Sequence, residues 1–248
     1  MLAYHNDPQI KADILAQLER HRAADELVKG QYWKDGKGCA VACTIHSDDH
    51  AEYEVRFGIP QMLARFEDRI FEGLSDDLSQ EWPIRFMSSI EPGQDLSLVG
   101  WRFLHRLLID SVLNPGITDN NVVDVVRACA DVTEPLTRGG NIDQAAAEST
   151  KNAAIACASE GLRAAESAGS AENTAGIATA FAAANVAKAV ARAANAASAA
   201  KVADIAAARA AESAAWQGAA ESARARRAAY RAAYARQADL LIELIKTT

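Results

Sequence analysis

Two cysteines and two histidines fall within twelve residues of the segment GKGCAVACTIHSDDH. They are Cys39, Cys43, His46 and His50, and thiolate and imidazole groups are common zinc ligands. Their spacings of 4, 3 and 4 would place all four on one face of a single helix. One straight helix offers a metal two ligands more readily than four, so a metal site would need a bend near the Ser-Asp-Asp sequence or a ligand from elsewhere. The same spacing is typical of a buried stripe, and we expect that structural role.

A cysteine nucleophile is the second chemistry that this segment could supply. Cys39 follows two closely spaced glycines, so it could lie in the first turn of a helix, where the helix dipole lowers the pKa of a thiol. A thiol enzyme also needs a histidine base. The candidates are His46, which lies too far along the same helix, and His105 or His5, which would have to approach Cys39 in space. The sequence DGKGCA has neither Walker spacing nor a dinucleotide-binding fingerprint, and we expect no cofactor.

A ligand-binding surface is the third possibility. The stretch SARARRAAYRAAYARQ spaces arginines by three and four residues along a predicted helix, and such a face can contact phosphate groups or nucleic acid. Aromatic rings could stack on a nucleotide base. The alternative is a solvated helix surface, or one paired with the acidic N-terminal half, and the negative net charge favours it. The candidate contacts are Tyr32, Trp33, Trp101, Arg224, Arg227, Tyr230, Arg231 and Tyr234.

The bulk composition narrows the function classes. The chain has 248 residues, of which 50% are apolar but only 6% aromatic, and its formal net charge is −7. This charge argues against nonspecific binding to nucleic acid or to anionic membranes. Four scattered cysteines fit a reducing cytosol better than a disulfide framework. The sequence shows neither a signal peptide nor an apolar run that could cross a bilayer, so we expect a cytoplasmic protein.

The composition changes at Gly139 and Gly140. About 44 of the 108 residues that follow are alanine, far above ordinary usage. The chain carries about 23 acidic and 14 basic residues before this point, and about 10 acidic and 12 basic residues after it. We therefore predict an acidic helical domain over 1–138 and an alanine-rich helical domain over 141–248.

Helical periodicity predicts an all-α fold in both halves. In the first half, one helix begins at Pro8 and runs to Gly30, and another begins at Pro60. The second helix has an apolar stripe on one side, and the residues predicted to face out are Arg65, Glu67, Asp68 and Arg69. Alanine has the highest helix propensity, so the second half is predicted to be almost entirely helical, with a break near Asn195. Since an isolated alanine-rich rod would expose its larger apolar residues, we predict an antiparallel helical bundle.

Three segments of the N-terminal half resemble an uncharacterised family of bacterial and phage or prophage proteins. They are HRAADELVKGQYWKDGKGCAVACTIHS, HAEYEVRFGIPQMLARFEDRIFEGL and WPIRFMSSIEPGQDLSLVGWRFLHRLL. The resemblance covers roughly residues 5–110 and departs from the family pattern at Ala42, where glycine is expected. It implies an intracellular protein associated with mobile elements, and it supplies no catalytic residues.

These observations favour a non-catalytic binding protein with a protein partner. In the phage or prophage setting that the resemblance suggests, this protein would inhibit a host defence protein. Direct nucleic-acid binding is disfavoured by the charge, and no membrane contact is expected. Two alternatives stay open: an enzyme or metal site at Cys39–His50, and a protein that sequesters or senses a small ligand such as a nucleotide. The oligomeric state cannot be read from the sequence.

Overall fold

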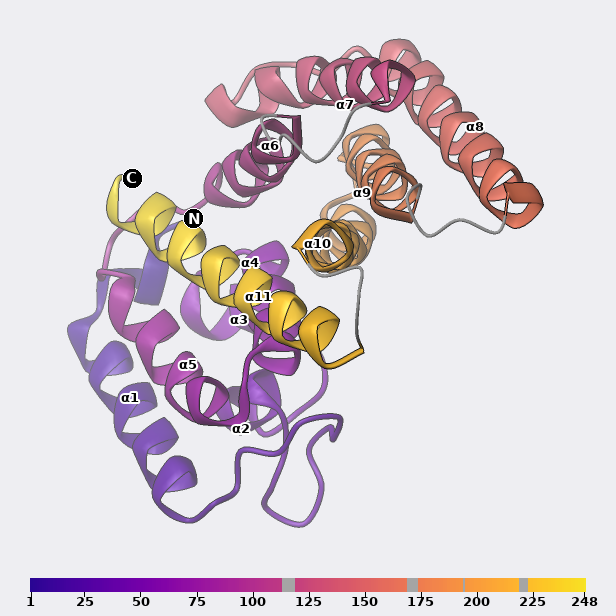
Figure 1. The fold of residues 1–248 in the computed structure, drawn as a ribbon. Helices are drawn as coiled ribbons and strands as arrows, with labels where there is room; N and C mark the ends of the chain where they lie inside the picture. The colour runs from indigo at the N-terminus through magenta and orange to yellow at the C-terminus, as the bar shows by residue number, and fades with distance from the viewer. Residues whose placement is uncertain (113–118, 169–173, 194, 219–222) are drawn as a thin grey trace. The chain divides into compact units, whose positions relative to one another are not determined.

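The computed structural model describes residues 1–112, 119–168, 174–193, 195–218 and 223–248. Within these ranges the chain forms eleven α-helices and no β-strand, which confirms the predicted all-α class (Figure 1). The helices are α1 (Pro8–Ala23), α2 (Ala40–Ile45), α3 (Glu52–Phe57), α4 (Gln61–Gly73), α5 (Asp76–Ser89), α6 (Val99–Val112), α7 (Asn120–Thr133), α8 (Gln144–Ala168), α9 (Thr174–Ala191), α10 (Ala196–Gly218) and α11 (Ala223–Lys246), with short 3₁₀ segments at Ala3–Asn6 and Glu134–Arg138.

The chain divides into two compact units. The first unit comprises residues 1–100 together with 234–248, and the second unit comprises residues 101–233. The change in composition at 138–141 lies inside the second unit. The last fifteen residues of the alanine-rich half belong to the first unit, so composition and packing divide the chain differently.

Local signals set the beginnings of the helices in the first unit. Pro8 is the first residue of α1, and the Asp7 side chain accepts a hydrogen bond from the backbone N–H of Gln9. Helix α4 follows Pro60, as predicted. Helix α1 ends at Ala23 instead of running to Gly30. The chain turns there because residues 26–28 form backbone hydrogen bonds with Gly38.

Helix α4 is buried on more than one side. Its apolar stripe is buried as predicted, but Glu67 is also fully buried and Asp68 keeps only 21% of its side chain exposed. The prediction that these two acidic residues face out is therefore wrong. An amphipathic pattern predicts one packed face, whereas α4 contacts α2, α3 and α5 and so has little free surface.

The C-terminal part of α11 packs into the first unit. Leu241, Ile242 and Ile245 are buried there. The Gln94 amide donates a hydrogen bond to the backbone carbonyl of Ile245 at 2.5 Å. The apolar end of the chain therefore has the partner surface that its sequence requires, and this surface is supplied by the N-terminal helices.

The second unit contains an antiparallel arrangement of its long helices. Helix α9 packs against both α8 and α10. The hydroxyl of Thr179 near the beginning of α9 bonds that of Ser213 near the end of α10, and Gln144 at the beginning of α8 bonds the carbonyl of Ala191 at the end of α9. Helix α9 ends at Ala191 and α10 begins at Ala196, which confirms the predicted break near Asn195. The Asn195 side chain caps α10 by accepting a hydrogen bond from the Ser198 N–H.

Alanine forms most of the contact surface of α10. Its buried alanines recur at helical spacing, while Lys201, Ile205 and Arg209 on the same helix are exposed. Small side chains at helix contacts allow the helix axes to approach closely. The buried alanines of α10 are Ala199, Ala200, Ala203, Ala206, Ala207, Ala211 and Ala215.

Enlarging a buried alanine of α10 is therefore expected to separate two helices. Ala207 is 0% exposed, so Ala207→Leu should lower the free energy of unfolding by roughly 1–3 kcal/mol through overpacking. The partly exposed Ala210 is the matched control, and Ala210→Leu should change it by less than about 0.5 kcal/mol. Urea denaturation followed by circular dichroism measures both. Equal effects at the two positions would contradict the helix contact.

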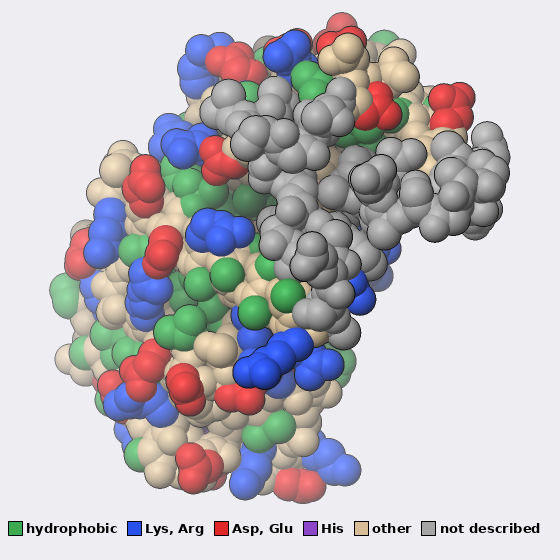
Figure 2. All heavy atoms as spheres, in the orientation of Figure 1, with side chains coloured by type: hydrophobic (Ala, Val, Ile, Leu, Met, Phe, Trp, Pro, Cys, Tyr) green, Lys and Arg blue, Asp and Glu red, His purple; other side chains and the backbone are tan. Residues whose placement is uncertain are grey.

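Charged side chains of both signs are interspersed over the face shown in Figure 2. Ion pairs within the first unit include Lys11–Glu91 at 3.0 Å and Arg85–Asp239 at 2.6 Å. Exposed pairs of this kind each contribute about 0–1 kcal/mol, so the core carries most of the stability. Across the described helices, none has both the length and the apolar character needed to span a membrane.

Candidate functional site

The Cys/His segment begins as a helix and then leaves it. Cys39 is the N-terminal cap residue of α2, and Cys43 lies inside this six-residue helix. His46 adopts a left-handed conformation, with φ 56° and ψ 37°, and ends the helix. His50 therefore lies in the following loop, where its Nδ1 is 3.1 Å from the Asp48 carbonyl.

The four side chains of this segment point to different partners. The Cys43 thiol donates to the carbonyls of Glu26 and Gly38 at 3.5 and 3.4 Å. His46 contacts His21 instead. In the described part of the chain, no group of three or more His, Cys, Asp or Glu side chains is arranged to hold a metal ion.

Cys39 lies in surroundings that keep its thiol protonated. The side chain is 3% exposed, and burial together with the neighbouring Asp68 carboxylate raises the pKa of the thiol well above its ordinary value. These two effects outweigh the helix N-terminus, which was expected to lower this pKa. Within the first unit, neither expected base lies beside the thiol: His46 contacts His21, and His5 lies at the Val55 carbonyl. The third candidate, His105, belongs to the second unit.

Slow alkylation of Cys39 is the expected consequence. At pH 8 iodoacetamide should modify it at least about tenfold more slowly than free cysteine, because little thiolate forms. Asp68→Asn should speed the reaction, since it removes a charge that raises the thiol pKa. Peptide-resolved mass spectrometry over a pH series measures both rates. Rapid labelling with a midpoint below about 8.5 would instead indicate an activated nucleophile.

A small acidic pocket opens beside Cys39. Its volume is about 180 Å³, and it is formed by the chain before α2 and one side of α4. Two carboxylates one helical turn apart face this space, together with one guanidinium group. The residues that line the acidic pocket are Gly30, Gln31, Tyr32, Cys39, Asp68, Arg69 and Glu72.

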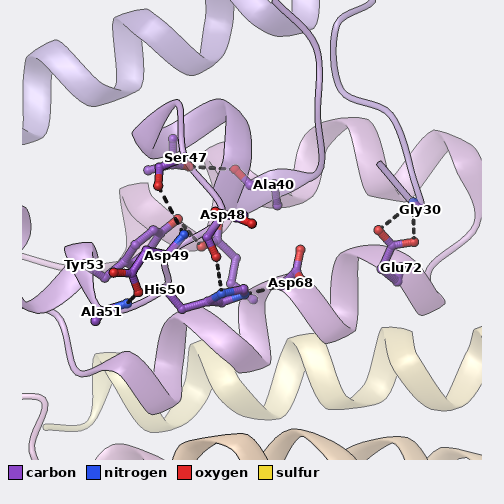
Figure 3. Close-up of polar contacts among 12 residues, drawn as sticks. Gly30, Ala40, Ser47, Asp48, Asp49, His50, Ala51, Tyr53, Asp68 and Glu72 are labelled. Atoms are coloured by element: carbon purple, nitrogen blue, oxygen red, sulfur yellow. Dashed lines mark hydrogen bonds and ion pairs between the residues drawn. The ribbon is translucent and has the colours of Figure 1, made fainter. Parts of the chain in front are cut away.

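The two carboxylates of the acidic pocket are held differently (Figure 3). Both oxygens of Glu72 accept from the Gly30 N–H, at 2.8 and 2.9 Å, and burial raises the pKa of Glu72. Asp68 Oδ2 lies 3.5 Å from Nε2 of the buried His50. Asp68 Oδ1 is buried and accepts no hydrogen bond from a nitrogen or oxygen of the described residues, and the weakly donating Cys39 thiol lies beside the Asp68 side chain.

A buried carboxylic acid lies on the same helix, next to Asp68. The Tyr53 hydroxyl donates to Glu67 Oε2 at 2.6 Å, and the Trp82 indole N–H donates to the Glu67 carbonyl at 2.9 Å. Burial raises the pKa of Glu67 from 4.5 to about 8, so this side chain is largely protonated at neutral pH. It stabilises the packing around α4 as a neutral hydrogen-bonding group.

The predicted nucleotide contacts are divided between the two units. In the first unit, Tyr32 is exposed at the acidic pocket, Trp33 stacks on His46 at 4.3 Å, and Tyr234 is buried. In the second unit, Trp101 packs against a cluster of buried apolar residues. Three arginines of α11 in the second unit are exposed and form no ion pair with described residues, as expected of a solvated face: Arg224, Arg227 and Arg231.

Comparisons of the chain with protein-family models, with characterised proteins and with solved structures found no match.

Sequence reasoning identified two residues of the acidic pocket, Cys39 and Tyr32, but missed the two carboxylates. Asp68 and Glu72 were available as an i, i+4 acidic pair on a predicted helix. The helical pattern by itself predicts that this acidic pair is exposed to solvent. The fold alone shows that the chain before α2 covers it.

Proposed function

We propose that this chain is a binding protein whose first unit captures a cationic side chain, arginine or lysine, of a protein partner in the acidic pocket. The observation that carries the proposal is the pair of pocket carboxylates, Asp68 and Glu72, which lie one helical turn apart in a pocket with a single guanidinium group. A guanidinium or ammonium group of a ligand would donate charge-assisted hydrogen bonds to these carboxylates.

The charge of the surroundings supports a cationic ligand. The two carboxylates outnumber the one guanidinium of the pocket, Arg69. The first unit as a whole has about 20 acidic and 12 basic residues, so its field attracts a basic partner. Tyr32 is 63% exposed and offers an aromatic face to a cation at the pocket.

The size of the pocket favours a side chain over a nucleotide. A volume of about 180 Å³ is below the roughly 300–1,000 Å³ of sites that enclose a drug-sized ligand. A phosphate group would also meet two carboxylates there. The nucleotide-sequestering alternative therefore has less support at this site than a single cationic group.

The state of the thiol supports binding over thiol catalysis. A nucleophilic cysteine requires a thiolate and a base within hydrogen-bond reach. Cys39 is buried with a raised pKa, and the carboxylate of Asp68 lies beside it instead of an imidazole. Inhibition of a host defence protein is a narrower form of this proposal, and the resemblance of the N-terminal half to phage and prophage proteins is what suggests it.

Fluorescence anisotropy with a labelled arginine peptide tests the proposal. We expect saturable binding that is lost when citrulline, the neutral isostere, replaces arginine. Glu72→Gln should weaken binding about tenfold or more, since it removes one charge-assisted hydrogen bond. Glu91→Gln is the matched control, because it removes the same charge from an exposed site outside the pocket. Equal binding of both peptides would refute the proposal.

A further inference from the structure

A second polar centre in the first unit joins three residues that the acidic pocket does not use. His21 near the end of α1 contacts the Glu26 carboxylate through Nδ1 at 2.6 Å, and its Nε2 lies 2.9 Å from Nε2 of His46. The His46 ring also stacks on Trp33, with ring centroids 4.3 Å apart and planes 22° apart. Three segments of chain therefore meet at this histidine pair: α1, the connection to α2, and the C-terminal end of α2.

The two imidazoles bond to each other directly and do not share a metal. Their ring centroids are 5.1 Å apart, and the two Nε2 atoms are 2.9 Å apart. The difference is about the sum of the two distances from a ring nitrogen to the centre of its own ring. The two nitrogens therefore point at each other along one line, and a metal between them would need a much longer separation. The contact is a hydrogen bond in which one ring donates and the other accepts.

Only some protonation states allow this bond. With Nδ1–H of a neutral His21 donating to Glu26, Nε2 of His21 is the acceptor and Nε2–H of His46 is the donor. A single added proton can still be accommodated, since one nitrogen remains unprotonated. When both rings are protonated, two N–H groups face each other and the bond is lost.

The surroundings of His46 oppose its protonation. Burial is the largest effect that lowers the pKa of His46 below its ordinary 6.5, and the positive charges of His21, Arg56 and Arg20 lower it further. The Glu26 carboxylate raises this pKa and so acts in the opposite direction. His46 also has the left-handed backbone, φ 56°, that non-glycine residues rarely adopt. The contacts with His21 and Trp33 hold the residue in this conformation.

We propose that the His21–His46 pair is a proton-sensitive latch, which fastens the C-terminal end of α2 at neutral pH and releases it when both rings are protonated. Because the pKa of His46 is lowered in the folded state, the stabilisation is present above about pH 6.5 and is lost as the pH falls through the lower folded value. Helix α2 begins directly after Cys39, which lines the acidic pocket, so the latch and the pocket lie at opposite ends of the same short helix.

Histidine-labelled NMR on the full chain tests the latch. We expect His46 to titrate below 6.5, and His21→Gln to raise its midpoint because a positive neighbour is removed. Glu26→Gln should move the midpoint in the opposite direction, since the carboxylate favours the protonated ring. His5→Gln, which lies at the Val55 carbonyl, is the control and should leave it unchanged.

Hydrogen exchange supplies the structural readout. After correction for the intrinsic pH dependence, the backbone N–H groups of Cys43 and His46, which bond within α2, should exchange about tenfold faster once His46 is protonated. This acceleration should be absent in His21→Gln, where the latch no longer exists at any pH. The proposal would be overturned if neither substitution changed the titration midpoint of His46. It would also be overturned if the α2 amides exchanged at the same corrected rate above and below that midpoint. Neither result depends on whether the acidic pocket binds a cation.

Discussion

Gly73→Ala is expected to destabilise the first unit by about 3 kcal/mol. Gly73 ends α4, and a methyl group there would overlap three ring carbons of Tyr234 from α11. Tyr234 is 1% exposed, so its ring has no free space to enter. The substitution would therefore push the C-terminal segment away from α4. Hydrogen exchange of the α4 and C-terminal amides measures the resulting loss of local stability.

Two comparisons isolate the cause of this effect. Gly100→Ala is the matched control, because its methyl group would meet the flexible Met62 side chain, which can move aside at low cost. In a Tyr234→Ala background the overlap no longer exists, so Gly73→Ala should then cost almost nothing. If Gly73→Ala were equally harmful in both backgrounds, the contact between α4 and the C-terminal segment could not be its cause.

Glu67→Gln is expected to change how the stability of the chain depends on pH. The pKa of Glu67 is raised from 4.5 to about 8 in the folded state, so folding favours the protonated acid. Its contribution is complete below about pH 4.5 and is lost as the pH rises through about 8. A difference of this size corresponds to on the order of 4–5 kcal/mol. The glutamine side chain of the variant is neutral at every pH, so the variant should not show this loss.

Thermal unfolding from pH 5 to pH 9 measures the effect. Over this pH range, the Tm of the wild type should fall by about 10 °C more than the Tm of Glu67→Gln. This expectation uses a Tm change of about 2–4 °C for each kcal/mol of stability in a chain of this size. The difference between the two proteins removes the titration of the surface carboxylates. Parallel curves would show that Glu67 is ionised in the folded chain at neutral pH, in conflict with its burial.

The sequence predicted the helices where the determining signal is local. Pro8 and Pro60 mark helix starts because proline fits the beginning of a helix and disrupts its interior. Asn195 marks the start of α10 because its side chain accepts a free backbone N–H. Pro83 is an exception to this rule, because it lies inside α5 and does not end the helix. Packing of α5 keeps the helix continuous at a residue that would otherwise interrupt it.

The candidate site could not be predicted in the same way, since it depends on contacts between distant segments. The spacing of Cys39 and His46 suggested one helical face, but the chain reverses at His46 and the two residues have different neighbours. The partners of the histidine pair and of the pocket, Glu26 and Asp68, come from separate elements. Burial also reversed the expected effect of the helix N-terminus on the Cys39 thiol, and burial is a property of the fold.

The division between the two units has the same origin. Composition changes at Gly139 because about 44 of the 108 residues that follow Gly140 are alanine. Packing follows the larger apolar side chains instead, and those at the C-terminal end of α11 are buried in the first unit. The two ends of the chain therefore belong to one unit, and the acidic pocket lies in the unit that the C-terminal segment completes.

An NMR titration with a cationic ligand is the most direct test that the acidic pocket binds an arginine or lysine side chain. The probe is Nα-acetyl-arginine methylamide, titrated into the ¹⁵N-labelled full chain, with the citrulline analogue as the neutral control. We predict saturable shifts of the Gly30, Gln31, Cys39 and Glu72 amides with the arginine compound alone, weakened about tenfold in Glu72→Gln. Shifts of equal size with citrulline, or shifts confined to residues outside the acidic pocket, would contradict the proposed function.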